Sequence, residues 1–353
     1  MGGRFPLTTT GEGEGRLPRL TARDKLVFAG KILVSVALLG LCIHYVDFGS
    51  TLAALSKIAW PPLILAFIFA TVGTVVLPAF MTHSAMRVTG MRKSMAELIA
   101  LNFSVRFYVI VLPRIASIWI RWRRYGDGVL KGDTFALIAF ERAVQMLTLC
   151  SLSAVALVLE QDRLGHAGWL TLQASLVATV ISVGILAAFL FRPAAILLTS
   201  VTVRLEPFLP TPISRRLTSL VEAVAAYRHM SPGRTGLIFW WSLVGFALFI
   251  MSSYVVAIAL GLKISILALT WVRSFVFLMT LMPLSIAGIG LREVGFVGLL
   301  SLYGMAAEDA LAFSLANFAL QLGMAVIGAL FELRLLFLHD KAASRASPAE
   351  VKA

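Results

Sequence analysis

The stretch Pro283-Leu-Ser-Ile-Ala-Gly-Ile-Gly-Leu-Arg-Glu293 interrupts an apolar segment that runs from Ile264 to about Leu302. Proline lacks a backbone N–H group and glycine adopts positive φ easily, so the helix expected there is broken. At membrane depth, non-helical backbone is tolerated only where protein or a water-filled cavity covers it. The stretch therefore predicts a broken helix inside a membrane protein.

The two glycines of this stretch, Gly288 and Gly290, have a functional and a purely structural interpretation. If a half-helix begins after Gly290, its free N–H groups point into the membrane interior and favour an anion, and Arg292 adds positive charge there. Alternatively, the glycines form a simple kink. We favour the first interpretation, which makes the stretch part of a binding site.

The composition fits a membrane protein. Hydrophobic residues make up 59% of the 353 residues and charged residues only 14%. Soluble domains carry roughly 45–50% apolar and about 25% charged residues. The apolar residues form continuous blocks of helical length and lack the alternation of a barrel. Six blocks predict full transmembrane helices: Leu26–Val46, Leu63–Phe80, Phe135–Leu159, Trp169–Phe191, Thr235–Leu260 and Leu311–Leu338.

The net charge of +13 lies mainly in the polar segments between these blocks. Because positively charged loops stay in the cytoplasm, both termini, the loop around Arg87 to Lys93 and the segment 192–234 are predicted to be cytoplasmic. That segment includes an amphipathic surface helix around Ile213 to Tyr227. The chain is therefore expected to be a multi-pass protein of the cytoplasmic (inner) membrane. Anionic lipid suits its basic surface, whereas nucleic acid is not an expected partner.

A second apolar segment, Ala96 to Trp119, is interrupted by Pro113. Basic residues flank both of its ends, so the simplest path is a re-entrant hairpin that enters and leaves on the cytoplasmic side. By the same reasoning, the Ile264–Leu302 segment starts and ends outside. Three spans and a hairpin, followed by the same set inverted, predict an inverted repeat of the kind found in transporters.

Weak internal similarity agrees with this repeat. Phe135–Gln145 aligns with Leu311–Gln321, and the stretch from Pro113 to Arg121 aligns with that from Pro283 to Arg292 with one extra residue. We expect an all-α polytopic protein with about six full transmembrane helices and two re-entrant hairpins. Its predicted parts are a disordered cytoplasmic tail (1–25), one transmembrane domain (26–338, with halves at about 26–160 and 169–338) and a cytoplasmic tail (339–353).

Ionisable groups inside the apolar segments are the candidates for function. Each costs about 2.5–3.5 kcal/mol at the bilayer centre on insertion scales, so each needs a partner or water. The arginines of the broken segments suit a phosphate, which guanidinium forks bind. The alternatives are snorkelling side chains and ion pairs that only fix helix packing. The predicted substrate-binding residues are Asn102, Arg106, Pro113, Arg114, Arg121, Glu141, Arg142, Gln145, Arg273, Pro283, Gly288, Gly290, Arg292, Glu293, Asn317 and Gln321.

Catalytic chemistry is not indicated. The five histidines are scattered without metal-ligand spacing, and the sequence has no paired catalytic carboxylates, P-loop or nucleophile elbow. Cys42 and Cys150 lie in apolar segments and indicate no disulfide framework. We expect no metal, no cofactor and no enzymatic activity.

The Pro283–Glu293 stretch resembles the proline–Gly-Gly-x-Gly-x-Arg-Glu signature of the lysylphosphatidylglycerol synthase transmembrane-domain family, also called flippase-like. In the first half, Pro113, Arg121 and Glu141-Arg142 match the family's proline, arginine and Glu-Arg pair. The resemblance covers about residues 26–338. Two departures are Ala287, where the family usually has glycine, and Ser117-Ile118, where it often has glycine and an acidic residue.

This resemblance implies a lipid flippase or transporter. The soluble aminoacyl-transferase domain of the full-length synthases is absent, so translocation or binding of lipid is expected and synthesis is not. Aminoacylated phospholipid, hopanoid and polyprenyl-phosphate sugar stay open as substrates, and the oligomeric state stays open too. The alternatives are a scaffold for a glycosyltransferase or lipid-modifying enzyme, and a lipid phosphatase, against which the missing acidic pairs and Ser-Arg-Ser type loop argue.

Overall fold

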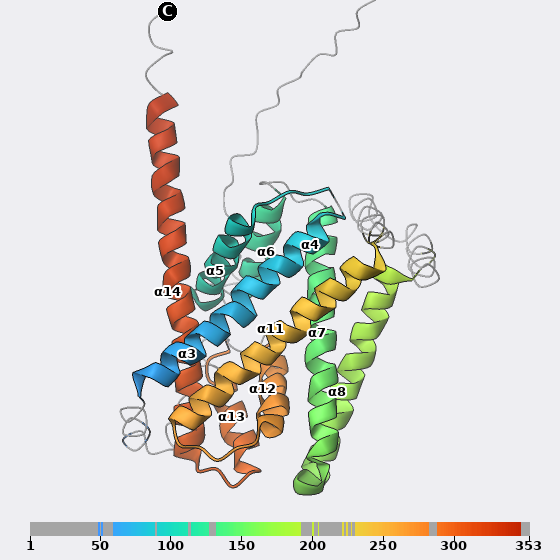
Figure 1. The fold of residues 1–353 in the computed structure, drawn as a ribbon, viewed down its shortest axis with the longest axis vertical. Coiled ribbons are helices and arrows are strands. Elements are labelled where there is room, and N and C mark those ends of the chain that lie inside the picture. Colours follow the sequence, from blue (N-terminus) through green and yellow to red (C-terminus); the bar gives the residue numbers. More distant parts are fainter. Residues whose placement is uncertain are drawn as a thin grey trace, which may run out of the picture.

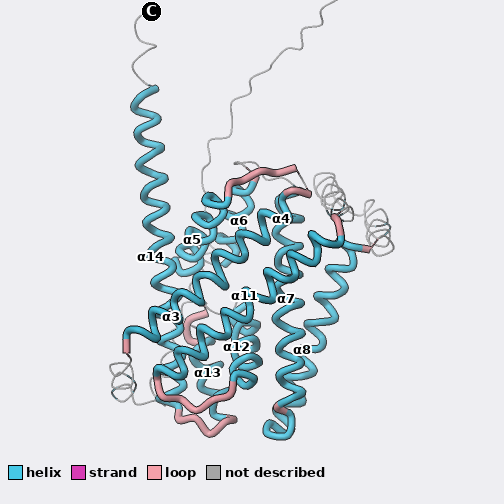
Figure 2. Tube along the Cα trace, viewed as in Figure 1, coloured by secondary structure: helices cyan, strands magenta, loops and turns pink. Residues whose placement is uncertain are grey.

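The computed structural model describes residues 59–88, 90–111, 114–126, 132–191, 230–281 and 288–346, together with the single positions 49, 51, 200, 204, 221, 224 and 227. Regular structure in these segments is entirely helical, and they contain no strand (Figure 2). The predicted all-α class is confirmed. The predicted span Leu26–Val46 and most of the predicted surface helix around Ile213–Tyr227 lie outside the described residues.

Two long apolar paths run side by side across the near side of the bundle in Figure 1. One is α3 (Trp60–Thr71), a π-helical turn η1 (Val72–Val76) and α4 (Leu77–Met86), and the other is α11 (Pro232–Ala259). Prolines in the first turn start both paths, because that turn needs no N–H donor. At their closest approach, a Cβ on Gly73 would lie 2.6 Å from the carbonyl oxygen of Gly245. The two helices therefore touch backbone to backbone.

Each interrupted segment forms two short helices. They are α5 (Met95–Val111) with α6 (Arg114–Tyr125), and α12 (Ile266–Leu281) with α13 (Leu291–Ser301). α6 has 12 residues and α13 has 11. At 1.5 Å per residue, these helices are about 18 Å and about 17 Å long, too short to cross a hydrocarbon core of about 30 Å. Each segment is thus interrupted, as predicted, and the prolines expected to cause this, Pro113 and Pro283, lie outside the described residues.

The two helical hairpins, α5–α6 and α12–α13, lie toward opposite ends of the bundle (Figure 1). Three longer helices complete it: α7 (Gly132–Leu159), α8 (Gln161–Leu190) and α14 (Ala307–Ala346). α5 packs against α14 and α12 packs against α7, so the first helix of each hairpin lies on a long helix of the opposite half. α6 contacts α7 and α13 contacts α14, each the next long helix in sequence. The two halves thus interlock through one repeated pattern.

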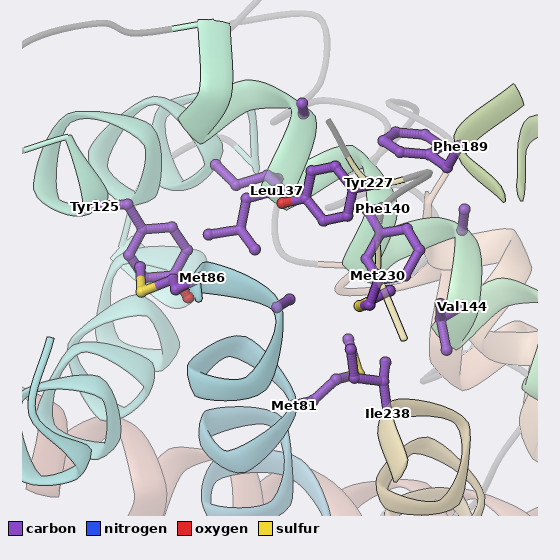
Figure 3. Packing of buried hydrophobic residues seen from close by; sticks show 14 of the residues in the cluster. Met81, Met86, Tyr125, Leu137, Phe140, Val144, Phe189, Tyr227, Met230 and Ile238 are labelled. Atoms are coloured by element: carbon purple, nitrogen blue, oxygen red, sulfur yellow. The ribbon is translucent and has the colours of Figure 1, made fainter. Parts of the chain in front are cut away.

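Buried apolar side chains form a cluster beside each hairpin. Near α5–α6, Tyr125 lies against Met86, and Phe140 lies beside Tyr227 and Phe189 (Figure 3). The ring centroids of Phe140 and Tyr227 are 4.8 Å apart. A second cluster surrounds α12–α13 and contains Trp271, Phe296 and Phe313 among its largest buried side chains. This packing fixes the hairpin helices to the rest of the protein.

Four helices among the described residues are long and apolar enough to cross a membrane: Trp60–Met86, Gly132–Leu159, Pro232–Ala259 and Ala307–Arg334. They coincide with four of the six predicted spans. The predicted span Trp169–Phe191 falls in α8. Its apolar stretch Thr171–Ala187 is shorter than the four helices above. α14 continues past the predicted end of its span at Leu338 to Ala346.

Candidate functional site

A cavity of about 430 Å³ lies among α4 with η1, α5, α6, α7, α11 and α12, so both hairpins contribute to its walls. Its volume falls in the range of small-molecule sites, about 300–1,000 Å³. α5, α6 and α7 supply its charged and amide side chains, which are Asn102, Arg106, Arg121, Arg142 and Gln145. α11 and α12 supply aromatic side chains, which are Trp241, Phe246, Phe249 and Phe277. Among the described lining residues there is no aspartate or glutamate.

The irregular helix at η1 holds the α5 side chains in place. Pro78 has no N–H group to donate to the carbonyl of Thr74, four residues earlier, and the π-turn widens the neighbouring backbone. Arg106 donates from Nη2 to the oxygen of Thr74 at 2.8 Å, and Asn102 donates from Nδ2 to the oxygen of Val75 at 3.0 Å. The π-helical irregularity in this helix thus orients two cavity residues on α5.

Arg121 of α6 connects the cavity to a buried carboxylate. Its Nη2 donates to Oδ1 of Asn102 at 2.7 Å, and its Nη1 lies 3.6 Å from Oε2 of Glu141 on α7. The Arg121 guanidinium also lies over the Tyr125 ring, 5.5 Å from its centroid. Arg121 lines the cavity, whereas Glu141 is only 1% exposed and does not. Glu141 therefore acts on the cavity through Arg121.

Arg142 and Gln145 lie one helical turn apart on α7, and both line the cavity. Arg142 is exposed and donates from Nη1 to Oε1 of Gln145 at 3.2 Å. The amide thus positions the guanidinium without neutralising its charge. With Arg106 and Arg121, three arginines from three helices face one space.

The second hairpin uses its charged pair differently from what the sequence indicated. Gly288 and Gly290 adopt φ of +79° and +81°, so both need the freedom of glycine. The Gly290 N–H donates to Oε2 of Glu293 at 2.7 Å, and Arg292 Nε donates to Oε1 of Glu293 at 2.9 Å. The backbone N–H groups of Arg292 and Val294 donate to Gly288 and Gly290. The expectation that the start of α13 offers free N–H groups to an anion is wrong at these positions, because the protein itself satisfies them.

Arg273 of α12 is 6% exposed and lies outside the cavity lining. Its guanidinium lies 4.2 Å from the ring centroid of Phe249, a cavity residue. The described residues give its Nε no hydrogen-bond partner. Arg292 acts on it as a like charge. Arg273 is thus a buried cation that an aromatic ring separates from the cavity.

The remaining predicted residues contact other parts of the protein, do not line the cavity, or have side chains outside the described part of the structure. Asn317 accepts from Ser253 Oγ at 3.1 Å and donates to the Phe313 oxygen at 2.9 Å, so it joins α14 to α11. Gln321, its partner one turn on, is half-buried and does not line the cavity. Arg114 begins α6, and its side chain lies outside the description. The sequence alignment pairs Gln145 with Gln321, but only Gln145 lines the cavity.

One polar cluster was absent from the predicted site. Glu332 of α14 accepts from Arg124 of α6 through both carboxylate oxygens at 2.6 Å, and from the Tyr108 hydroxyl of α5 at 2.8 Å. An acidic residue inside the apolar run Leu311–Leu338 was the available signal, since an intramembrane ionisable group rarely lacks a partner. The cavity's aromatic residues carried no signal, because aromatic residues are common throughout the apolar segments.

The fold and the cavity define the class of protein. It is a multi-pass membrane protein, helical throughout the described segments, with two broken-helix hairpins and an arginine-lined cavity between packed helices. Within the described segments, no group of three or more His, Cys, Asp or Glu side chains is placed to hold a metal ion.

The chain belongs to the family described as lysylphosphatidylglycerol synthase TM region, which matches residues 28–329. The resemblance carried by Pro283–Glu293 is thereby confirmed. A comparison with curated proteins gave no match.

Proposed function

We propose that the protein is a lipid flippase that binds the headgroup of an anionic or prenyl-linked lipid in the cavity and moves it across the cytoplasmic membrane. The observation that carries this proposal is the lining, which presents three arginines and two amides without a carboxylate among the described residues. Guanidinium and amide groups donate hydrogen bonds to phosphate, and a low-dielectric surrounding strengthens them. A phosphate-bearing headgroup is therefore the matching ligand.

The interlocked helices favour movement over static binding. In this proposal, α5–α6 is a re-entrant hairpin on the cytoplasmic side, α12–α13 is its inverted counterpart on the outer side, and both termini are cytoplasmic. Each first hairpin helix packs on the long helix of the other half, as expected for an inverted repeat. Such repeats alternate access by rocking one unit against the other around a site near the midplane.

The cavity also offers a surface for the apolar part of a lipid. The aromatic side chains of α11 that line the cavity, Trp241, Phe246 and Phe249, are apolar, in contrast to the charged arginines. Large apolar side chains on the outside of the bundle, such as Val180 and Ile181 of α8, are exposed and suit contact with lipid tails. The ligand is thus a membrane lipid, and the proposed activity is translocation without a chemical step.

A headgroup-accessibility assay tests this proposal. The protein is reconstituted into vesicles that carry fluorescent phosphatidylglycerol or a fluorescent polyprenyl phosphate, and a membrane-impermeant quencher reports how fast the label changes leaflet. Arg106→Ala and Arg142→Ala should slow the movement about tenfold or more, because a hydrogen bond to a charged group contributes about 1.5–3 kcal/mol. Arg123→Ala is the matched control, since Arg123 is exposed on α6 and does not line the cavity. Movement of both lipids at the rate of protein-free vesicles would rule out the proposal.

A further inference from the structure

Three buried glutamates are paired with arginines in the described part of the chain, and one of them differs from the others. In Glu293, one oxygen accepts from Arg292 and the other from the Gly290 N–H group. In Glu332, both oxygens accept from Arg124. In Glu141, Oε2 faces Arg121 at 3.6 Å, and Oε1 has no hydrogen-bond partner among the described residues. Glu141 is therefore the least satisfied carboxylate of the three.

The cations beside Glu141 are also the cations of the cavity. Arg121 and Arg142 both act on its charge, and both line the cavity. An anion bound in the cavity draws on the same two guanidiniums. In a buried site, a carboxylate whose counter-charge is shared with a second anion is strongly disfavoured in its ionised form.

The other groups around Glu141 do not replace those cations. Tyr125 comes from α6, Tyr227 lies nearby, and the Thr82 hydroxyl of α4 lies beside the carboxylate. These groups are neutral and supply at most a hydrogen bond. Arg273 of α12, the helix that packs on α7, lies over Phe249 and is not among the groups that act on Glu141.

We propose that Glu141 is a proton-binding site linked to the cavity, so that binding of an anionic headgroup is accompanied by uptake of one proton at Oε1. The inference rests on the proposed function, because it needs an anion in the cavity. The proton comes from water, an O–H bond forms at Oε1, and no other bond changes. The carboxylate loses its charge as the anion's charge enters, so the total charge of the cavity and its surroundings is kept.

This linkage has a consequence for transport. Coupling between two binding sites is reciprocal, so protonation of Glu141 strengthens anion binding by the same factor as anion binding strengthens protonation. A proton and an anionic headgroup then cross together, and a proton gradient can drive the lipid.

Titration calorimetry on the purified full-length protein tests the inference. Short-chain phosphatidylglycerol is the probe, because its phosphodiester stays ionised across the range used. Binding is measured in two buffers of different ionisation heat, which gives the number of protons taken up for each lipid bound. Because buried glutamates titrate anywhere between about pH 4 and about pH 9, the measurement covers that range.

The wild-type protein should take up as much as one proton for each lipid, and its affinity should fall as pH rises, within the range of about 5- to 150-fold that is usual for site coupling. Glu141→Gln, which resembles the protonated form, should take up no proton and keep high affinity at every pH. Glu332→Gln, which removes a paired glutamate outside the cavity, should keep the proton uptake.

Two failures are distinguishable. If the wild-type protein binds phosphatidylglycerol with no proton uptake and no dependence on pH, the inference is wrong and the proposed function stands. If the wild-type protein and Arg106→Ala both fail to bind any anionic lipid, the proposed function fails and the inference falls with it. Even if Glu141→Gln does not fold, the two-buffer measurement on the wild-type protein can overturn the inference, because binding without proton uptake contradicts it.

Discussion

Gly73 and Gly245 face each other where α3–η1–α4 packs along α11, and the carbonyl oxygen of each obstructs a Cβ on the other. A Cβ on Gly73 would lie 2.6 Å from the Gly245 oxygen, and a Cβ on Gly245 would lie 2.9 Å from the Gly73 oxygen. The obstacle in both cases is backbone, which cannot rotate away as a side chain can. This close packing therefore requires glycine at both positions.

Gly73→Ala is expected to lower stability. Replacing glycine by alanine inside a helix contributes about 1 kcal/mol in favour of folding, whereas overpacking a close contact costs about 1–3 kcal/mol. Gly236→Ala is the matched control, because Gly236 is also inside a helix, α11, and a Cβ there meets nothing within 4 Å. Thermal unfolding in detergent should show a loss for the first variant and a small gain for the second. Equal changes in unfolding temperature for the two variants would contradict the close packing at Gly73.

The Arg124–Glu332 pair is expected to hold α6 against α14. Both guanidinium Nη groups lie 2.6 Å from carboxylate oxygens, which is the bidentate arrangement that arginine forms and lysine cannot. Arg124→Lys, Glu332→Gln and the double variant form a cycle in which the coupling energy should be about 0.5–3 kcal/mol. Additive losses of unfolding free energy in this cycle would show that the pair contributes no coupling.

Much of the fold follows from local features that a single sequence carries. Continuous apolar blocks and prolines mark helices and their breaks, so the four spans and both hairpin interruptions could be predicted. The pairing of each hairpin with the opposite half could not, because apolar helices match many partners equally well. The contact between Gly73 and Gly245 depends on which helices pack together, and the sequence alone does not specify that.

The candidate site divides in the same way. Charged and amide residues inside apolar segments are costly, so Asn102, Arg106, Arg121, Arg142 and Gln145 were predicted for this reason, and the structure brings them to one cavity. Arg273 and Arg292 met the same criterion, but the structure buries both side chains and neither of them lines the cavity. Charge in an apolar segment identifies a residue that needs a partner, and only the packing decides whether the partner is protein or ligand.

Arg273→Met is expected to separate stability from transport. A buried cation with an unsatisfied Nε contributes little to stability, and replacing a buried charge by an apolar side chain of similar size is often neutral or stabilising. The same charge lies behind Phe249 and raises the positive potential of the cavity, so its removal should slow lipid movement several-fold. Unfolding temperature and headgroup accessibility are measured on one preparation. A large loss of stability with unchanged transport would assign Arg273 to packing alone.

Cysteine labelling is expected to place the two hairpins on opposite sides of the membrane. Arg87 follows α4 and Arg123 lies near the end of α6, and both are exposed at the end of the bundle where α5–α6 lies. Lys263 and Ala306 are exposed in the loops at the other end, beside α12–α13. Met86 and Tyr125 pack in one buried cluster (Figure 3), so we expect the ends of α4 and α6 to lie on the same face of the bilayer. In a background without Cys42 and Cys150, a membrane-impermeant maleimide should label Arg87→Cys and Arg123→Cys only from the cytoplasmic side, and Lys263→Cys and Ala306→Cys only from the outside. Labelling of Arg123→Cys from the same side as Lys263→Cys would mean that α5 and α6 cross the membrane, and the re-entrant arrangement would be wrong.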